Sequence, residues 1–259
     1  MQKLYVVKIG GNIIDDPEAL ENFLSQFAAI DQPKILVHGG GKLATEMAAT
    51  LKIPQQMIEG RRVTDEATLK VVTMVYAGFI NKNIVAKLQA KACNAIGMTG
   101  ADGNIILAKK RAVNDIDYGF AGDVVTVNND FLKTLLEKNC TPVLAPITHD
   151  GDGQLLNTNA DTIASEIAKA MSHSYSVQLI YCFDKKGVLE NINDDNSVIK
   201  IITKENFPAL KADSIIHAGI IPKIENALAA VDEGVQNVCI GHGLDLSEIV
   251  RGEAGTSIK

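Results

Sequence analysis

Two groups of glycines stand where short apolar runs of the sequence end. Gly10-Gly11 follows Leu4–Ile9, and Gly39-Gly40-Gly41 follows Ile35–Val37. Glycine lets the backbone approach a ligand closely, and the N–H groups at the start of a following helix attract anions. One glycine-rich turn is often only a tight turn. Two such turns, after the first two apolar runs, predict a cradle for phosphate groups.

Three basic residues are candidates to meet an anion held there. Lys8 interrupts the first apolar run, and a buried ammonium is costly unless it faces negative charge. Lys223 opens a predicted helix after Pro222, where the helix dipole disfavours a cation unless an anion is bound. Arg62 lies in a predicted loop, and a guanidinium suits bidentate capture of a carboxylate. The alternatives are a Lys8 that reaches water from an edge strand and a Lys223 on the surface.

A run of short polar residues precedes another predicted helix. It reads Asn157-Thr158-Asn159-Ala160-Asp161, and helix capping needs only one of these side chains. The amides can bind a carboxylate, and Asp161 can hold lysines in place. Phosphoryl transfer requires positive charge and positioning around the transferred group, which these residues supply together with the lysines and glycines. No general base is needed if the acceptor is a carboxylate, because carboxylates are already ionised at pH 7.

Two nucleotide-binding fingerprints were weak matches to the second glycine turn. A Walker A loop fails, because Leu43 stands where Ser or Thr is required. The dinucleotide fingerprint is met in form by Gly39, Gly41 and Ala44, with the acidic Glu59 about 20 residues further on. A nicotinamide-dependent oxidoreductase is therefore a second class of function that these residues leave open.

The composition is that of an ordinary globular protein. The 259 residues are 46% hydrophobic and 22% charged, and the net charge is −6. An acidic balance argues against general affinity for DNA or RNA, because phosphate neutralisation drives such binding. No apolar stretch approaches the roughly 18 residues of a membrane span, and the chain does not begin with a signal segment. The four cysteines and five histidines are scattered, so we expect reduced thiols, no metal site built from side chains, and a cytoplasmic location.

Strand-like and helix-like segments alternate along the chain. The first four imply a parallel sheet, and they are Leu4–Ile9, Pro17–Ile30, Ile35–Val37 and Lys42–Leu51. The periodic stretch Asp65–Asn94 predicts one long helix with a weak point at Gly78, and short β-like runs at 95–98, 104–108 and 123–127 predict hairpins. We therefore predict an α/β fold, a three-layer α/β/α sandwich with a mainly parallel central sheet and a β-hairpin insertion in the middle.

The residues that could carry chemistry fall in the order and spacing of a known family. The motifs are Lys8-Ile9-Gly10-Gly11, His38-Gly39-Gly40-Gly41, Gly60-x-Arg62-Val63-Thr64, Asn157-x-Asn159-Ala160-Asp161 and Pro222-Lys223. On these motifs the chain resembles the amino acid kinase superfamily over essentially its whole length, and the acetylglutamate kinases within it most closely. The first two motifs are shared across the superfamily. The segment around Arg62 and the run from Asn157 are much more specific.

The resemblance implies an activity and a role for each matching residue. The expected reaction is phosphorylation of the γ-carboxylate of N-acetyl-L-glutamate, or of a close relative such as N-succinyl-L-glutamate, by MgATP in arginine biosynthesis. By resemblance, Lys8 and Lys223 stabilise charge on the transferring phosphoryl group, and Asp161 orients the two lysines. Mg²⁺ would be held mainly by phosphates and water, as is usual for that ion.

Other residues would bind the two substrates. The resemblance places one set on the acylglutamate, namely Arg62, Asn157, Asn159, Gly40 and Gly41. A second set would contact the nucleotide and its phosphates, namely Lys8, Gly10, Gly11, Gly40, Gly41, Asp184, Lys186 and Lys223. One position departs from the family pattern, because Phe183 precedes Asp184 where Thr or Ser is usual.

The resemblance also implies how the chain is organised. Residues 1–175 would form an N-terminal lobe that binds the acylglutamate and dimerises, and residues 176–259 a nucleotide-binding lobe on the same sheet. A homodimer joined through Asp65–Asn94 is expected, and insensitivity to arginine, because the chain begins directly at the first strand. The alternatives are another carboxylate or carbamate kinase of the superfamily, and a non-catalytic ligand-binding regulator of the same fold.

Overall fold

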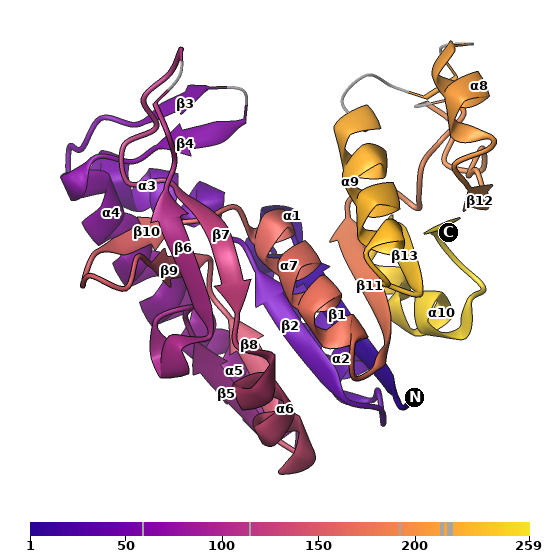
Figure 1. The fold of residues 1–259 in the computed structure, drawn as a ribbon, viewed down its shortest axis with the longest axis horizontal. Coiled ribbons are helices and arrows are strands. Elements are labelled where there is room, and N and C mark those ends of the chain that lie inside the picture. The colour runs from indigo at the N-terminus through magenta and orange to yellow at the C-terminus, as the bar shows by residue number, and fades with distance from the viewer. Residues whose placement is uncertain (59, 114, 192, 213–214, 217–219) are drawn as a thin grey trace.

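The structure is a computed structural model that describes residues 1–58, 60–113, 115–191, 193–212, 215–216 and 220–259. At its centre is an eight-stranded sheet (Figure 1), in which every pair of neighbouring strands is parallel except the pair β13–β14. The strand order is β12 (Ile201–Ile202), β14 (Thr256–Ile258), β13 (Asn237–His242), β11 (Ser176–Phe183), β1 (Lys3–Ile9), β2 (Lys34–His38), β8 (Thr141–Leu144) and β5 (Ala95–Met98). The predicted parallel sheet is confirmed.

Helices cover both faces of this sheet, because side chains alternate between the faces along each strand. Leu4 and Val6 of β1 join one buried cluster, and Val7 and Ile9 join the other. The first cluster is covered by α6 (Asn129–Glu137), α7 (Ala160–Ser172) and α9 (Ile221–Asp232). The second is covered by α2 (Pro17–Ala28), α3 (Gly41–Thr50), α5 (Asn81–Gln89) and α10 (Leu246–Arg251). The three-layer sandwich is therefore confirmed.

Two smaller sheets stand apart from the main one. The first has four strands in the order β10 (Leu155–Asn157), β9 (Ile147–His149), β6 (Ile106–Lys110) and β7 (Gly122–Val127). It contains the β9–β10 hairpin and the antiparallel pair β6–β7. The prediction of a hairpin at residues 95–98 is wrong, because that run is β5, which pairs parallel with β8. A short apolar run fits either kind of strand, so its pattern could not decide between them.

The second small sheet is an arm made by β3 (Gln56–Ile58) and β4 (Arg61–Val63). The prediction that Arg62 lies in a loop is wrong, because it is the central residue of β4 and pairs with Met57. Strands of three residues are too short to show the alternation that identifies a strand. The arm stands beside the main sheet and carries Arg62 toward α3 (Figure 1).

The predicted long helix is continuous but not uniform. It consists of α4 (Glu66–Val72), the π-helical segment η1 (Thr73–Ile80) and α5, and the expected weak point Gly78 lies in η1. Wider π-turns inside α-helices are rare and often occur at functional sites. The remaining elements are α1 (Gly11–Ile14), η2 (Asp102–Asn104), α8 (Phe207–Ala212) and η3 (Gly243–Asp245). In the described part of the chain, no helix combines the length and apolar character needed to cross a membrane.

Candidate functional site

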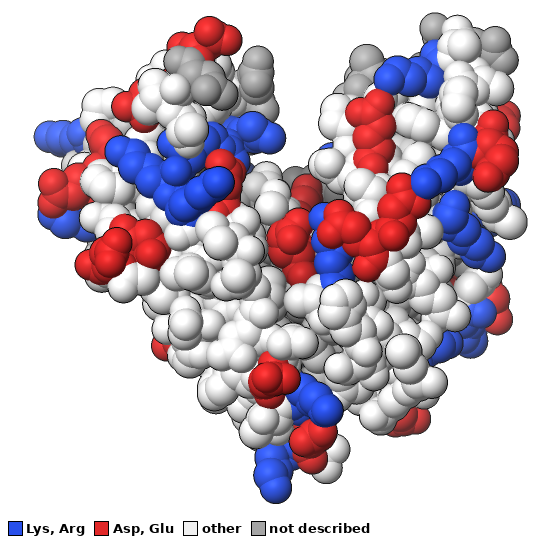
Figure 2. Space-filling model, in the orientation of Figure 1, with Lys and Arg blue, Asp and Glu red and all other residues white. Residues whose placement is uncertain are grey.

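The carboxyl ends of β1 and β2 lie beneath a hollow in the surface. Figure 2 shows this hollow between the part of the molecule that carries β3 and β4 and the part that carries α8 and α9. Gly10 follows β1 and Gly39 follows β2, and these two strands are parallel neighbours, so both glycine turns open at one edge of the sheet. Ligands of open α/β sheets bind at this edge.

The second glycine turn requires glycine at its centre. Gly40 has a φ of 146°, and a Cβ atom there would overlap Cδ1 of Ile80 and stand 3.2 Å from Cδ1 of Tyr76. Gly40 is also the N-cap of α3, whose first residue is Gly41, and it forms no side-chain cap. Backbone N–H groups at the start of a ten-residue helix therefore face this space, which suits an anion.

Lys8 lies in the middle of the main sheet, so the edge-strand alternative is wrong. β1 pairs with β11 on one side and β2 on the other, and Lys8 is only 8% exposed. Its Nζ is 2.6 Å from Oδ1 of Asp161 in the first turn of α7. That Oδ1 atom is buried, and its approach to the ammonium is ionic rather than an aligned hydrogen bond. The negative partner that a buried ammonium requires is thus Asp161.

The first turn of α9 brings a second ammonium to the same place. Nζ of Lys223 lies 3.7 Å from the centre of the Phe183 ring, and Nζ of Lys8 lies 5.3 Å from it. Burial lowers the pKa of Lys223; Asp161 opposes this shift and Lys8 adds to it. The alternative of a free surface lysine is therefore wrong, and the structure brings Lys8, Asp161 and Lys223 together.

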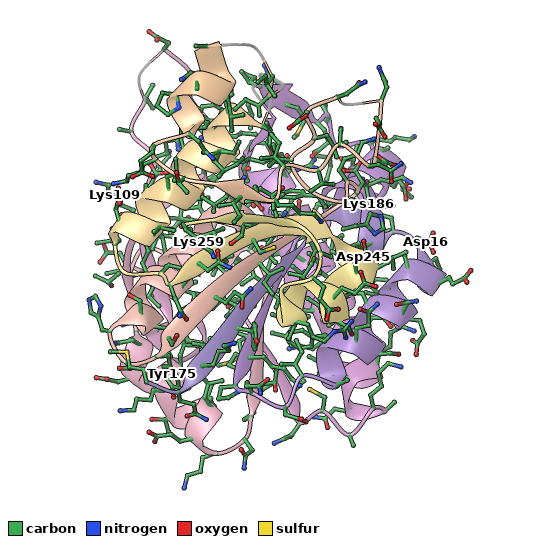
Figure 3. All side chains as sticks on the ribbon, turned by 90° about the vertical axis from the view of Figure 1, so that its right-hand side faces the viewer. Asp16, Lys109, Tyr175, Lys186, Asp245 and Lys259 are labelled. Carbon is green, nitrogen blue, oxygen red and sulfur yellow. The ribbon has the colours of Figure 1, made fainter. Side chains whose placement is uncertain are left out.

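Asp184 and Lys186 lie in the loop that follows β11. Both are exposed, and the carboxylate of Asp184 is close enough to Lys223 to raise its pKa slightly against the effect of burial. Figure 3 shows Lys186 well away from Tyr175, which precedes β11. The loop therefore lies at the carboxyl edge of the sheet, on the side of α9, although no direct contact joins Lys186 to the lysine pair among the described residues.

A cavity of about 190 Å³ lies beside the second glycine turn. Its walls include the predicted residues Gly40, Gly41, Arg62, Asn157 and Asn159, together with Tyr76 and Arg111, which were not predicted. Sites for drug-sized ligands usually measure about 300–1,000 Å³, so this cavity suits a smaller molecule. The expected acylglutamate residues are therefore brought together around one cavity.

Arg62 is fixed at the wall of this cavity. Its Nη2 donates hydrogen bonds of 2.9 Å to the carbonyl oxygen of Gly41 and to Oγ1 of Thr45, and Nη1 donates to Oε1 of Gln55. The guanidinium therefore lies over the first turn of α3 with its orientation set by three acceptors. Burial raises the pKa of Tyr76, and the Arg62 charge opposes that rise.

The two asparagines before α7, Asn157 and Asn159, have different roles. Oδ1 of Asn159 accepts from the N–H groups of Asp161 and Thr162, at 2.8 and 3.1 Å, so Asn159 is the helix cap. Nδ2 of Asn157 donates to Oγ1 of Thr64 at 3.0 Å, which ties this run to the segment of Arg62. A cap uses one polar side chain, as predicted, and Asn157 is left to line the cavity.

Similarity to known proteins identifies the family of this chain. The model described as the amino acid kinase family matches residues 3–242 of the chain. The chain belongs to the amino acid kinase family. Two similar proteins are named acetylglutamate kinase: that of Cytophaga hutchinsonii is 55% identical over 251 residues, or 96% of this chain and 95% of its own, and that of Phocaeicola vulgatus is 54% identical over 258 residues, or 100% and 99%.

A solved structure is similar over nearly the whole chain. The crystal structure of smu.665 from Streptococcus mutans is 29% identical, covers 99% of this chain and 98% of its own, and superposes with a TM-score of 0.80. The oxidoreductase alternative finds no support in the amino acid kinase family, and Glu59, the acidic residue of that fingerprint, lies outside the described residues.

In this amino acid kinase, the second glycine turn rests on a buried histidine whose role no sequence pattern revealed. Nδ1 of His38 is 2.8 Å from the carbonyl oxygen of Gly39, and Nε2 is 3.1 Å from Nδ2 of Asn81. That amide also donates to the carbonyl oxygen of Val143 at 3.0 Å. These contacts fit a neutral imidazole with its proton on Nδ1. Asn81 stands 43 residues away, so spacing gave no signal of this contact.

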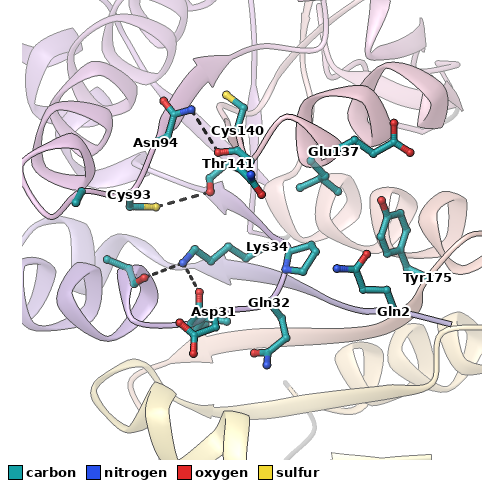
Figure 4. A pocket seen from close by; sticks show the side chains of 16 residues that line it. Gln2, Asp31, Gln32, Lys34, Cys93, Asn94, Glu137, Cys140, Thr141 and Tyr175 are labelled. Carbon is teal, nitrogen blue, oxygen red and sulfur yellow. Dashed lines mark hydrogen bonds between the residues drawn. The ribbon is translucent and has the colours of Figure 1, made fainter.

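A larger cavity, of about 430 Å³, opens at the other edge of the main sheet (Figure 4). Lys34 begins β2 there and donates to the carbonyl oxygens of Ala28 and Ile30, while Thr141 begins β8. Because α/β sheets bind ligands at the carboxyl ends of their strands, we assign the functional site to the first cavity.

The prediction of reduced cysteines is confirmed, since all four are free thiols, and they are Cys93, Cys140, Cys182 and Cys239.

We expect His38 to make the protein less stable in mild acid. Burial lowers the pKa of His38 to about 4, whereas an unfolded histidine titrates near 6.5. Below pH 6.5 the unfolded state gains a proton that the native state excludes, so unfolding becomes easier as the pH falls toward 4. Between pH 7 and pH 5 this effect is worth about 2 kcal/mol.

Urea unfolding at the two pH values measures this effect. The variant His38→Gln should lose that part of the pH dependence, whereas His149→Gln, which changes a histidine in the four-stranded sheet, should retain it. An unchanged pH dependence in His38→Gln would show that another group is responsible.

Proposed function

We propose that the protein phosphorylates the γ-carboxylate of N-acetyl-L-glutamate with MgATP, as an early step of arginine biosynthesis in the cytoplasm. The observation that carries this proposal is the ion pair of Lys8 and Asp161 with the Lys223 ammonium beside it, at the edge where both glycine turns open. The relatives named acetylglutamate kinase, similar over nearly their whole length, support the same activity. The intact lysines and Asp161 argue against a non-catalytic regulator.

The chemistry needs little beyond this arrangement. An oxygen of the acceptor carboxylate forms a bond to the γ-phosphorus of ATP while the bond to the β–γ bridging oxygen breaks, so ADP leaves and an acyl phosphate is formed. The γ-carboxylate has an ordinary pKa near 4.3, so no base has to remove a proton at pH 7. Lys8 and Lys223 would face the negative oxygens of the transferring group, and Asp161 would hold Lys8 in place.

The acceptor would occupy the small cavity. The Arg62 guanidinium and the Asn157 amide would hold its α-carboxylate, and Gly40 and Gly41 would present backbone N–H groups toward the phosphoryl group. Gly10 and Gly11 would do the same for the nucleotide phosphates, with Asp184 and Lys186 further along the nucleotide side. Residues 1–175 would then bind the acylglutamate and residues 176–259 the nucleotide.

The described residues fit a magnesium ion that arrives with the nucleotide. They contain no group of three or more His, Cys, Asp and Glu side chains that could hold a metal by themselves. Mg²⁺ commonly keeps several waters and is bound by one or two carboxylates and by substrate phosphates. The buried Oδ1 of Asp161 forms no aligned hydrogen bond and lies 2.6 Å from Nζ of Lys8, so Asp161 is the carboxylate of this site that could contact the ion. When bound, the ion would neutralise charge on the phosphates.

A coupled assay of ADP release tests the proposed function. N-acetyl-L-glutamate with MgATP should give steady turnover, and N-succinyl-L-glutamate, compared side by side, should be used less well. Carbamate and free glutamate serve as controls for other kinases of the family. The proposal fails if no N-acyl-L-glutamate supports ADP release under conditions where the protein is folded.

The lysine and the arginine should affect different kinetic constants. Lys8→Ala removes a charge that acts in the transition state, so we expect kcat to fall by at least about 100-fold with a small change in KM. Arg62→Ala removes a contact present before and during the reaction, so KM for the acylglutamate should rise by about tenfold or more with a smaller change in kcat. Steady-state kinetics measure both. If both variants change KM alone, the roles assigned here are wrong.

We also propose that the protein forms a homodimer through the helix of α4, η1 and α5. Met74 and Phe79 of η1 are 56% and 65% exposed on one short segment, and exposed apolar patches are typical of contacts with another protein. Phe79→Asp should convert a dimer to a monomer in sedimentation velocity. Val113→Asp, at a similarly exposed position outside this helix, should leave the dimer intact. A hexamer of the unaltered protein would contradict the proposal.

A further inference from the structure

The ring of Phe183 lies close to both lysines of the site. Its ring centre is 3.7 Å from Nζ of Lys223 and 5.3 Å from Nζ of Lys8. Both distances lie within the roughly 6 Å at which an ammonium over an aromatic face is attracted to it. One ring therefore contacts two cations that come from different elements, β1 and α9.

The strand pairing explains how one ring reaches both cations. In the register of the parallel strands β1 and β11, Lys8 is the partner of Tyr181, so their side chains point to the same face of the sheet. Phe183 is two residues beyond Tyr181 and shares that face, and the two rings stack with centres 6.2 Å apart. The hydroxyl of Tyr181 in turn donates to the carbonyl oxygen of Asp161 at 3.2 Å. The stacked ring of Tyr181 therefore holds the ring of Phe183 in place.

The carboxylates near the two lysines compensate Lys8 more directly than Lys223. Asp161 contacts Lys8 at 2.6 Å, whereas Asp161 and Asp184 act on Lys223 only through their charge. Lys223 is half-buried, and both its burial and the charge of Lys8 disfavour its ammonium form. The negative face of an aromatic ring offsets part of that cost. The ring of Phe183 supplies such a face, with its centre 3.7 Å from Nζ of Lys223.

We propose that Phe183 is a positioning residue, which holds the ammonium groups of Lys8 and Lys223 on one aromatic platform before the nucleotide binds. In this chain the ring keeps both lysines oriented toward the glycine edge while no phosphate is present to attract them. Positioning of this kind raises the rate because less ordering remains to be done at the moment of reaction.

The inference rests on the proposed roles of Lys8 and Lys223 in phosphoryl transfer. A first experiment separates the aromatic face from simple packing. Phe183→Leu keeps an apolar side chain and removes the ring, and kcat should fall by about 3–10-fold while KM for the acylglutamate stays within about twofold. Phe183→Tyr keeps the ring and should remain within about twofold of the unaltered protein. Phe207→Leu, a buried phenylalanine of the same core cluster, should lower stability without lowering kcat.

A graded test uses ring fluorination. Phenylalanines with one, two and three ring fluorines, incorporated at position 183 alone, keep the shape of the ring and progressively weaken its negative face. The logarithm of kcat should fall steadily along this series. A flat series, together with a Phe183→Leu variant of unaltered kcat, would overturn the proposal.

A measurement on the ligand-free protein does not depend on the activity at all. The pKa of Lys223 can be followed by NMR of ¹³C-labelled lysine, with Lys223→Arg used to assign the signal. Because the ring favours the charged form, Phe183→Leu should lower this pKa by at least about half a unit, and Phe183→Tyr should not. If the protein phosphorylates no acylglutamate, the proposed function fails while this shift still tests the platform; an unchanged pKa overturns the platform even if turnover is normal.

Discussion

The buried ion pair between Lys8 and Asp161 is the contact around which the site is organised. An ammonium in a middle strand of a sheet is unstable without a negative partner. For Lys8 that partner is Asp161, which belongs to the helix layer that covers this face of the sheet. Asp161 reaches it only because Asn159 begins α7 at the right residue. The side chain of Asp161 remains 33% exposed although its Oδ1 is buried, so water moderates the pair. One interaction therefore joins the central sheet, a covering helix and the open surface.

The glycine turns and the arm of Arg62 complete the site from the other side. Gly40 can adopt its backbone conformation only without a side chain, because Ile80 and Tyr76 occupy the space that a Cβ would need. The carbonyl of Gly41 then accepts from Arg62, which also binds Thr45. The start of α3 is thus shared between backbone groups that suit an anion and a guanidinium that suits a carboxylate.

Local patterns sufficed to predict the parts of this molecule that depend on neighbours in the chain. Glycines after apolar runs, a helix cap within the run 157–161 and a lysine inside a strand each have a signature of a few residues, and parallel strands bring them to one edge. Contacts between distant segments have no such signature. Asn81 meets His38 across 43 residues, and the ring of Phe183 meets Lys223 only after α9 has packed. The three-residue strand β4 was missed for a different reason, because it is too short to show alternation.

The π-helical segment η1 has two sides that serve different surfaces. Tyr76 and Ile80 point inward against the second glycine turn, and Met74 and Phe79 point outward. A widened turn changes which side chains share a face, so the segment shows one neighbourhood to the cavity and another to solvent over only eight residues. Any displacement of this short stretch, whether it starts at the outer surface or at the inner wall, is felt on both. The segment therefore links the outer surface of the protein directly to the wall of the cavity.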